Sequence, residues 1–175
     1  MSNEGMPENR KILTALKTLL FTILVPGTVT ILLPALLLSS PWNRVSLADG
    51  PFRYPGLVLI ILGALVYLRC AWEFAFAGKG TPAPIDPPKE LVAKGLYRYS
   101  RNPMYVGVLS VVFGEALWFE SLLLAGYGAA VFAGFHLFIV FYEEPVLRRK
   151  FREAYRRYCE AAPRWLFRIK RNRGE

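Results

Sequence analysis

Four long apolar stretches, separated by charged or proline-rich segments, dominate the chain. Between Lys17 and Arg44 no charged residue occurs, and as a helix this interval is long enough to cross a hydrocarbon core of about 30 Å. Three later stretches are also predominantly apolar, so the pattern predicts four transmembrane helices. The expected spans are residues 18–38, 55–78, 103–119 and 121–142.

The spans define the expected fold class, an all-α integral membrane protein in a single domain. We expect residues 1–17 to be a cytoplasmic segment and residues 18–175 to form one membrane domain. A cleaved signal peptide is the alternative for the first stretch, but its apolar run is long and no A-x-A site follows it. Composition agrees with a membrane protein, because 54% of the residues are hydrophobic and 14% are aromatic.

Several local signals refine the spans. Pro26 and Pro34 predict a kinked or loosened first helix. Arg69 and Glu73 lie four residues apart in the second span and are expected to neutralise each other. The third and fourth spans are separated only by a turn near residues 120–121, which predicts a tight antiparallel hairpin.

A basic segment follows the fourth span. Apolar or aromatic side chains recur every three or four residues between arginines and lysines, a pattern typical of an amphipathic helix in the headgroup layer. This interfacial helix is expected over about residues 145–159. Its apolar positions are Leu147, Phe151, Tyr155 and Tyr158.

Charge sets the expected orientation and partners. Lysines and arginines concentrate before the first span, between the second and third, and after the fourth, which predicts that both termini are cytoplasmic. The net charge of +9 is explained by these segments, so membrane lipids rather than nucleic acid are the expected partners.

The two cysteines show no metal-binding spacing, and no metal is expected. The oligomeric state stays open, because apolar faces in a membrane need no protein partner.

Candidate chemistry lies where residues 95–107 (G-L-Y-R-Y-S-R-N-P-M-Y-V-G) lead into the third span. With a rise of about 1.5 Å per residue, the hairpin puts Tyr105 level with His136 and Arg98 level with Glu143. Carboxylates, arginines and tyrosines are therefore expected to meet at the cytoplasmic end of the hairpin.

Each of these residues also has an ordinary structural explanation. Tyrosines at a membrane interface commonly belong to the aromatic belt at the level of the lipid headgroups. His136, deep in a span, can form a hydrogen bond between helices. Glu143 and Glu144 can form a solvated helix end, but acidic residues at a helix C-terminus oppose the macrodipole. This acidic pair therefore indicates a further role.

The motifs carry a family resemblance. The string L-V-A-K-G-L-Y-R-Y-S-R-N-P-M-Y-V-G, a later E-E pair, and K-F-R-E-A-Y-R-R-Y-x(4)-P-R resemble the isoprenylcysteine carboxyl methyltransferase family, which is related to the phospholipid methyltransferases. The family pattern is R-H-P-x-Y-x-G, a Glu pair, and F-G-x-x-Y-x-x-Y. The resemblance covers about residues 63–165 and extends to G-T-P-A-P-I-D-P-P, which resembles bacterial members, so a bacterial inner membrane is expected.

The resemblance implies S-adenosylmethionine as methyl donor, with a lipophilic small molecule or lipidated substrate entering from the bilayer. The family positions that would line the cofactor pocket with the Glu pair are Tyr97, Asn102, Pro103, Tyr105 and Gly107.

The chemistry of the cofactor agrees with these positions. Its sulfonium, ammonium and ribose groups suit carboxylate and aromatic partners, for which Glu143 is the first choice and Glu144 the second. Its carboxylate suits Arg98, Arg101 or backbone N–H groups near Pro103. His136, level with Tyr105, completes the expected cofactor-binding set.

Two positions depart from the family pattern. Asn102 replaces the family histidine and cannot titrate near neutrality. A carboxylate acceptor is already ionised and needs positioning rather than a base, whereas an amine acceptor would need Glu144 or His136 as the base. Arg152 replaces a family glycine, and we expect it at a solvated helix position with little consequence.

The expected catalytic residues are Arg164, Glu144 and Arg148, with Arg164, Arg148 and Arg149 holding an anionic group of the acceptor. A prenylcysteine-type carboxylate is the acceptor that the resemblance implies, and a phospholipid amine or another small lipophile is the alternative. A sterol-reductase-like NADPH oxidoreductase is disfavoured by the absence of further spans and of G-x-G-x-x-G, and a non-catalytic membrane scaffold is the remaining alternative.

Overall fold

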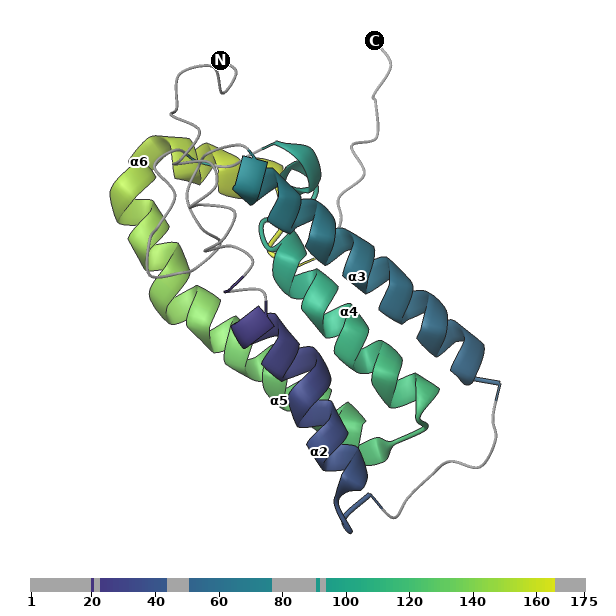
Figure 1. The fold of residues 1–175 in the computed structure, drawn as a ribbon. Coiled ribbons are helices and arrows are strands. Elements are labelled where there is room, and N and C mark those ends of the chain that lie inside the picture. Colours follow the sequence, from purple (N-terminus) through teal and green to yellow (C-terminus); the bar gives the residue numbers. More distant parts are fainter. Residues whose placement is uncertain (1–19, 21–22, 44–50, 77–90, 92–93, 166–175) are drawn as a thin grey trace.

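The computed structural model describes residues 20, 23–43, 51–76, 91 and 94–165, and this part of the chain consists of helices joined by turns (Figure 1). The predicted all-α fold class is confirmed. The elements in chain order are η1 (Thr28–Leu32), α2 (Leu33–Ser39), α3 (Arg53–Phe76), η2 (Gly95–Arg98), α4 (Pro103–Trp118), α5 (Leu122–Phe138), η3 (Ile139–Glu143) and α6 (Glu144–Ala161).

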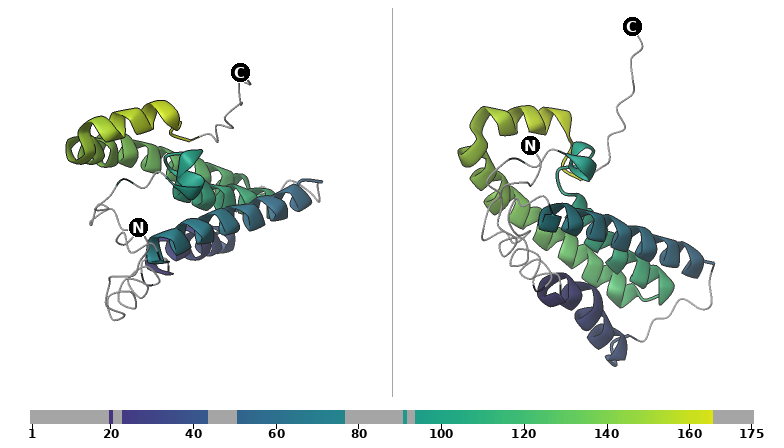
Figure 2. Two further views of the ribbon diagram at one scale, coloured as in Figure 1. Left: turned by 90° about the horizontal axis from the view of Figure 1, so that it is seen from above. Right: turned by 45° about the horizontal axis from the view of Figure 1, so that its top comes forward.

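Every predicted span corresponds to an apolar helix. The helices Arg53–Glu73 and Leu122–Ala161 are long and apolar enough to cross a membrane, and Ile23–Ser39 and Pro103–Trp118 are shorter apolar helices. Helices α2 to α5 run side by side as a bundle (Figures 1 and 2). The predicted N-terminal segment of residues 1–17 lies outside the described residues.

Helices α3 and α4 pack at close range through glycines spaced seven residues apart on each helix. A Cβ atom on Gly63 would lie 2.7 Å from the carbonyl oxygen of Gly107, and one on Gly114 would lie 2.8 Å from that of Gly56. Such close backbone contact is typical of membrane helices with small residues at their interface. The contact fixes the start of α4, where the candidate chemistry begins.

The hairpin between α4 and α5 turns where the sequence predicts. Glu120 adopts a left-handed conformation with φ of 51°, which reverses the chain between the helices. Ser121 then caps α5, its hydroxyl oxygen accepting a hydrogen bond of 3.2 Å from the backbone N–H of Leu124. The predicted ion pair of α3 is also present, with 3.2 Å between Arg69 Nη2 and Glu73 Oε1.

Two π-helical turns each end two residues before a proline. The backbone N–H of Leu33 bonds to the carbonyl of Thr28 just before Pro34, as the prediction of a loosened first span implied. In the same way the N–H of Glu144 bonds to the carbonyl of Ile139 just before Pro145, which the sequence reasoning did not predict. A proline clashes with the carbonyl four residues earlier, and the wider turn relieves that clash. The second turn admits one extra residue, so it rotates the start of α6 by about 100° around the helix axis.

Helix α6 is kinked at Arg152, which has φ of 43° and ψ of −115°. Arg152 is exposed, in agreement with the expected solvated position, but its backbone is not helical, so the expectation of little consequence is wrong. Beyond the kink, the second half of α6 turns across the end of the bundle (Figures 1 and 2). Its aromatic side chains Tyr155 and Tyr158 are buried and pack near Leu91 and Leu147, so they contact protein rather than lipid.

The kink yields a prediction about stability. Replacing Arg152 by Gly should raise the free energy of unfolding in detergent by about 1 kcal/mol, because glycine adopts a left-handed conformation without the Cβ clash. Arg149→Gly is the matched control, since it removes the same side chain from an exposed, regular helix position and should lower stability by about 1 kcal/mol. Equal losses of stability in Arg152→Gly and Arg149→Gly would show that Arg152 does not have a left-handed backbone conformation in the folded protein.

Candidate functional site

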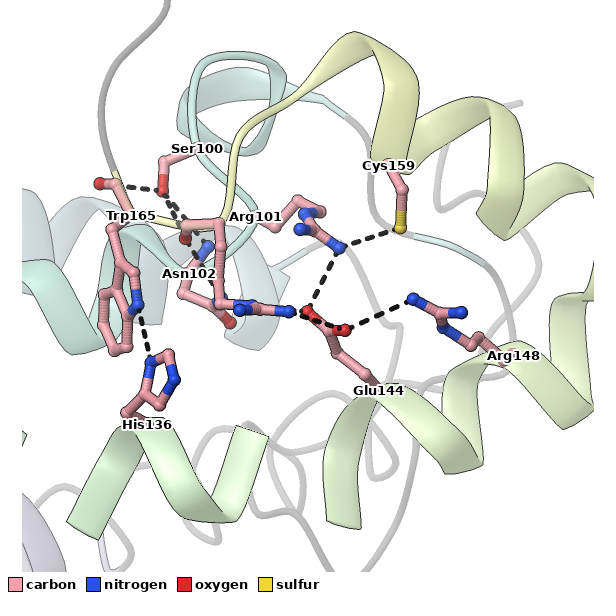
Figure 3. A network of polar contacts seen from close by, with 9 residues as sticks. Ser100, Arg101, Asn102, His136, Glu144, Arg148, Cys159 and Trp165 are labelled. Atoms are coloured by element: carbon pink, nitrogen blue, oxygen red, sulfur yellow. Dashed lines mark hydrogen bonds and ion pairs between the residues drawn. The ribbon is translucent and has the colours of Figure 1, made fainter. Parts of the chain in front are cut away.

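Glu144 lies at the centre of a charged cluster (Figure 3). Arg164 binds it through two hydrogen bonds, from Nε to Oε1 at 2.7 Å and from Nη2 to Oε2 at 3.1 Å. Arg101 Nη1 lies 3.2 Å from Oε1, and Arg148 Nη2 lies 3.6 Å from Oε2. The Glu144 side chain is only 6% exposed. We call these four residues the Glu144 cluster; with three guanidinium groups around one carboxylate, it carries excess positive charge.

The cluster keeps Glu144 ionised. Burial alone would raise the pKa of this carboxyl, but the hydrogen bond from Arg164 and the charges of Arg101, Arg164 and Arg148 hold it below the usual value of 4.5. An ionised carboxylate whose oxygens already accept from arginines is a weak proton acceptor. The geometry therefore disfavours the role of base that the sequence left open for Glu144.

The loop before α4 binds the chain beyond α6. The backbone N–H of Arg101 donates to the carbonyl of Pro163 at 2.9 Å, and the amide of Asn102 donates to the carbonyl of Arg164 at 3.1 Å. The Ser100 hydroxyl donates to the same Arg164 carbonyl at 3.3 Å. Asn102 makes no side-chain cap at the start of α4, because its amide holds this segment instead. An amide donor at this position thus has a structural role that needs no titratable group.

The second half of α6 also closes onto this loop. The Tyr158 hydroxyl donates to the backbone carbonyl of Tyr97 at 2.7 Å, and Arg101 Nη1 donates to Cys159 Sγ at 2.8 Å. The Tyr97 hydroxyl itself lies within hydrogen-bonding reach of Cys70 on α3, and burial raises the pKa of Tyr97 well above its usual value. Tyr97 therefore supports the site through its backbone and its packing.

Glu143 has different surroundings from its neighbour. Its Oε2 accepts a hydrogen bond of 3.1 Å from the Tyr105 hydroxyl, and the Tyr105 ring packs on Phe135 with centroids 4.7 Å apart. Phe135 is one residue from His136, the predicted partner of Tyr105. Glu143, predicted to lie level with Arg98, accepts a hydrogen bond from Tyr105 instead, and Arg98 is exposed. The adjacent glutamates bind separate partners, since consecutive residues of a helix point about 100° apart: Glu143 bonds to α4 and Glu144 to the arginines.

A small cleft lies between these two environments. Its lining residues come from the loop before α4, from η3 and from both halves of α6; they are Arg101, Asn102, Ile139, Glu143, Glu144, Leu147, Tyr155 and Tyr158. Arg101 Nε is buried there without a hydrogen-bond partner among the described residues. An unsatisfied buried guanidinium donor is costly, and a bound carboxylate would satisfy it.

The structure brings together only part of the predicted site. Gly107 serves the contact between α3 and α4, and Pro103 is the buried first residue of α4. Arg98 is exposed on η2, and His136 bonds to Trp165. The predicted residues that line the cleft are Arg101, Asn102, Glu143 and Glu144.

Some residues of the site were missed by the sequence reasoning. Tyr155 and Tyr158 were assigned to a lipid-facing stripe, although their spacing is the Y-x-x-Y part of the motif that carries the resemblance. Trp165 was not singled out, and no local pattern marks it.

Comparison with known families agrees with this arrangement. The family model for phospholipid methyltransferases matches residues 52–154, which is more than half of the chain. The chain therefore belongs to this family of membrane methyltransferases, and the family relationship expected from the motifs is confirmed. No curated protein matches the chain, and no solved structure does.

The Glu144 cluster yields a prediction about stability. Glu144→Gln should lower the free energy of unfolding in detergent by about 2 kcal/mol, because it leaves three guanidinium groups without their carboxylate. The value allows for the partial exposure of Arg164 (30%) and Arg148 (67%). Denaturant unfolding at neutral pH measures it.

Glu153→Gln is the matched control, because Glu153 also accepts hydrogen bonds from two arginines, but on the exposed surface of α6. This variant should leave stability unchanged within error.

The contribution of Glu144 to stability depends on pH with a definite sign. Since the pKa of Glu144 is lowered on folding, its contribution is present above pH 4.5 and is lost as the pH falls through the lower folded value. A deficit of Glu144→Gln that grew in acid would contradict the assignment.

Proposed function

We propose that this protein transfers a methyl group from S-adenosylmethionine to a lipophilic acceptor at the cytoplasmic face of the membrane. The observation that carries the proposal is a cleft lined by Glu143 and by Arg101, whose Nε is buried without a hydrogen-bond partner among the described residues, in a chain of a methyltransferase family. The cytoplasmic orientation is supported by the exposed basic residues of α6.

The residues of the cleft suit this cofactor. Arg101 Nε would hold its amino-acid carboxylate, and Glu143 would hold its ammonium or ribose hydroxyls. The rings of Tyr155 and Tyr158 supply aromatic surface near the cationic sulfur. When bound, S-adenosylmethionine supplies a methyl carbon attached to positively charged sulfur.

The cluster favours an anionic acceptor, as in a prenylcysteine-type carboxylate. Arg148 and Arg164 retain partly exposed guanidinium groups that can bind a carboxylate. In an in-line displacement the acceptor oxygen bonds to the methyl carbon as the carbon–sulfur bond breaks, and the electron pair of that bond remains on a neutral thioether. No proton moves, which suits a site where Asn102 replaces a histidine and Glu144 is held ionised.

A phospholipid amine is the second candidate, and one observation favours it. Glu143 is half-buried in the cleft and pairs with a tyrosine hydroxyl rather than with an arginine, so its carboxylate is placed to accept a proton. An amine acceptor must lose a proton to become nucleophilic, and Glu143 would take it. The family description also names phospholipids.

Methyl transfer from labelled S-adenosylmethionine tests the proposal. Purified protein in vesicles is offered prenylcysteine analogues, phosphatidylethanolamine and a total lipid extract. We expect alkali-labile label on the prenylcysteine carboxylate, because a methyl ester hydrolyses in base and an N-methyl group does not. Alkali-stable label on phosphatidylethanolamine would establish the second candidate. No label on any acceptor, with thermal stabilisation by NADPH but not by S-adenosylhomocysteine, would overturn the proposal.

Glu143→Gln should weaken binding of S-adenosylhomocysteine by about tenfold, because a charge-assisted hydrogen bond becomes a neutral one. Isothermal titration of the detergent-solubilised protein measures the dissociation constant. Glu115→Gln is the matched control, since Glu115 lies on α4 and does not line the cleft. Equal affinities in wild type and Glu143→Gln would remove Glu143 from the cofactor site.

A further inference from the structure

Trp165 makes a specific contact with the last turn of α5. Its indole N–H donates to Nδ1 of His136 at 3.2 Å, and the two rings stack with an interplanar angle of 21°. The ring of Phe132, one helical turn before His136, lies 5.1 Å from that of Trp165. This contact gives His136 the role of hydrogen-bond acceptor, which requires a neutral imidazole with its proton on Nε2.

Trp165 directly follows the arginine that binds Glu144 most closely. In Figure 3 the Trp165 ring points toward His136. The neighbouring side chain of Arg164 binds Glu144. The two consecutive side chains therefore bind opposite parts of the site. Arg164 reaches the start of α6, and Trp165 reaches α5 two turns earlier along the same continuous helix.

The segment that carries these residues has no helical hydrogen bonds of its own. Helix α6 ends at Ala161, and Ala162 is already extended, with φ of −124° and ψ of 129°. The position of residues 163–165 therefore depends on contacts with other elements. The backbone carbonyls of Pro163, Arg164 and Trp165 accept hydrogen bonds from the loop before α4, and the Trp165 side chain adds a separate contact with α5.

We propose that Trp165 is a positioning residue for methyl transfer. Through its hydrogen bond to His136 it fixes residues 163–165, so that Arg164 is held against Glu144 with its remaining donors available to the anionic group of the acceptor. An arginine side chain has many rotamers, and an anchored backbone reduces the entropy lost when it binds. The inference rests on the proposed function, because the role of Arg164 toward the acceptor belongs to that proposal.

Trp165→Phe tests the inference, because phenylalanine keeps an aromatic ring beside His136 and removes the donor. We expect the KM for a prenylcysteine acceptor to rise about fivefold, with kcat and the dissociation constant of S-adenosylhomocysteine changed less than about twofold. Trp118→Phe is the matched control at the opposite end of the bundle and should leave all three values unchanged. An unchanged KM in Trp165→Phe would overturn the inference.

A double variant distinguishes positioning from a separate contribution. If Trp165 acts through Arg164, then Arg164→Lys combined with Trp165→Phe should raise the KM no further than Arg164→Lys alone. A KM raised in the double variant by the product of the two single-variant increases would show that Trp165 contributes independently and would overturn the positioning role.

A double-mutant cycle of melting temperatures tests the Trp165–His136 contact independently of the proposed function. Trp165→Phe and His136→Ala each remove one partner of the same hydrogen bond, so the double variant should melt no lower than the less stable single variant. Additive losses would mean that the bond does not anchor the segment, whatever the activity. If the wild type methylates no acceptor, the proposed function fails together with the role in catalysis, and the cycle still shows whether the anchor exists.

Discussion

The site depends on the binding of one buried carboxylate, Glu144, by arginines from three parts of the chain. Arg101 comes from the loop before α4, Arg148 from α6 itself, and Arg164 from the segment beyond α6. Without Glu144, the buried Arg101 and the partly buried Arg164 would lose the carboxylate that compensates for their lost hydration. The shared carboxylate thus adds a charged link between segments that also meet through neutral hydrogen bonds and the packing of the α6 tyrosines.

Two departures from regular helix geometry make this convergence possible. The π-helical turn before Pro145 admits one extra residue and so rotates the start of α6, which carries Glu144 and Arg148, relative to α5. The left-handed residue Arg152 then turns the second half of α6 back over the cleft, where its tyrosines form part of the wall. Irregular turns of this kind recur at functional sites because they redirect side chains that a regular helix would place elsewhere.

The fold could be predicted from the sequence because hydrophobicity and helix rise are local properties. Apolar length alone located the spans, and counting from the turn placed Tyr105 within one residue of its partner Phe135. The same reasoning identified which segments meet, but not the contacts between them. The left-handed Arg152 and the contact of Trp165 with His136 depend on tertiary packing, and an arginine in place of a glycine hid the kink. The second π-helical turn did have a signal, since Pro145 follows the acidic pair.

An experimental structure of the protein with S-adenosylhomocysteine is the most direct test of this account. We expect the ligand carboxylate within hydrogen-bonding distance of Arg101 Nε, and Glu143 on the ligand's ammonium or ribose, while Glu144 stays bound to Arg164. A ligand held by Glu144 after release of its arginines, or bound outside the cleft with Arg101 Nε still unpaired, would contradict the account.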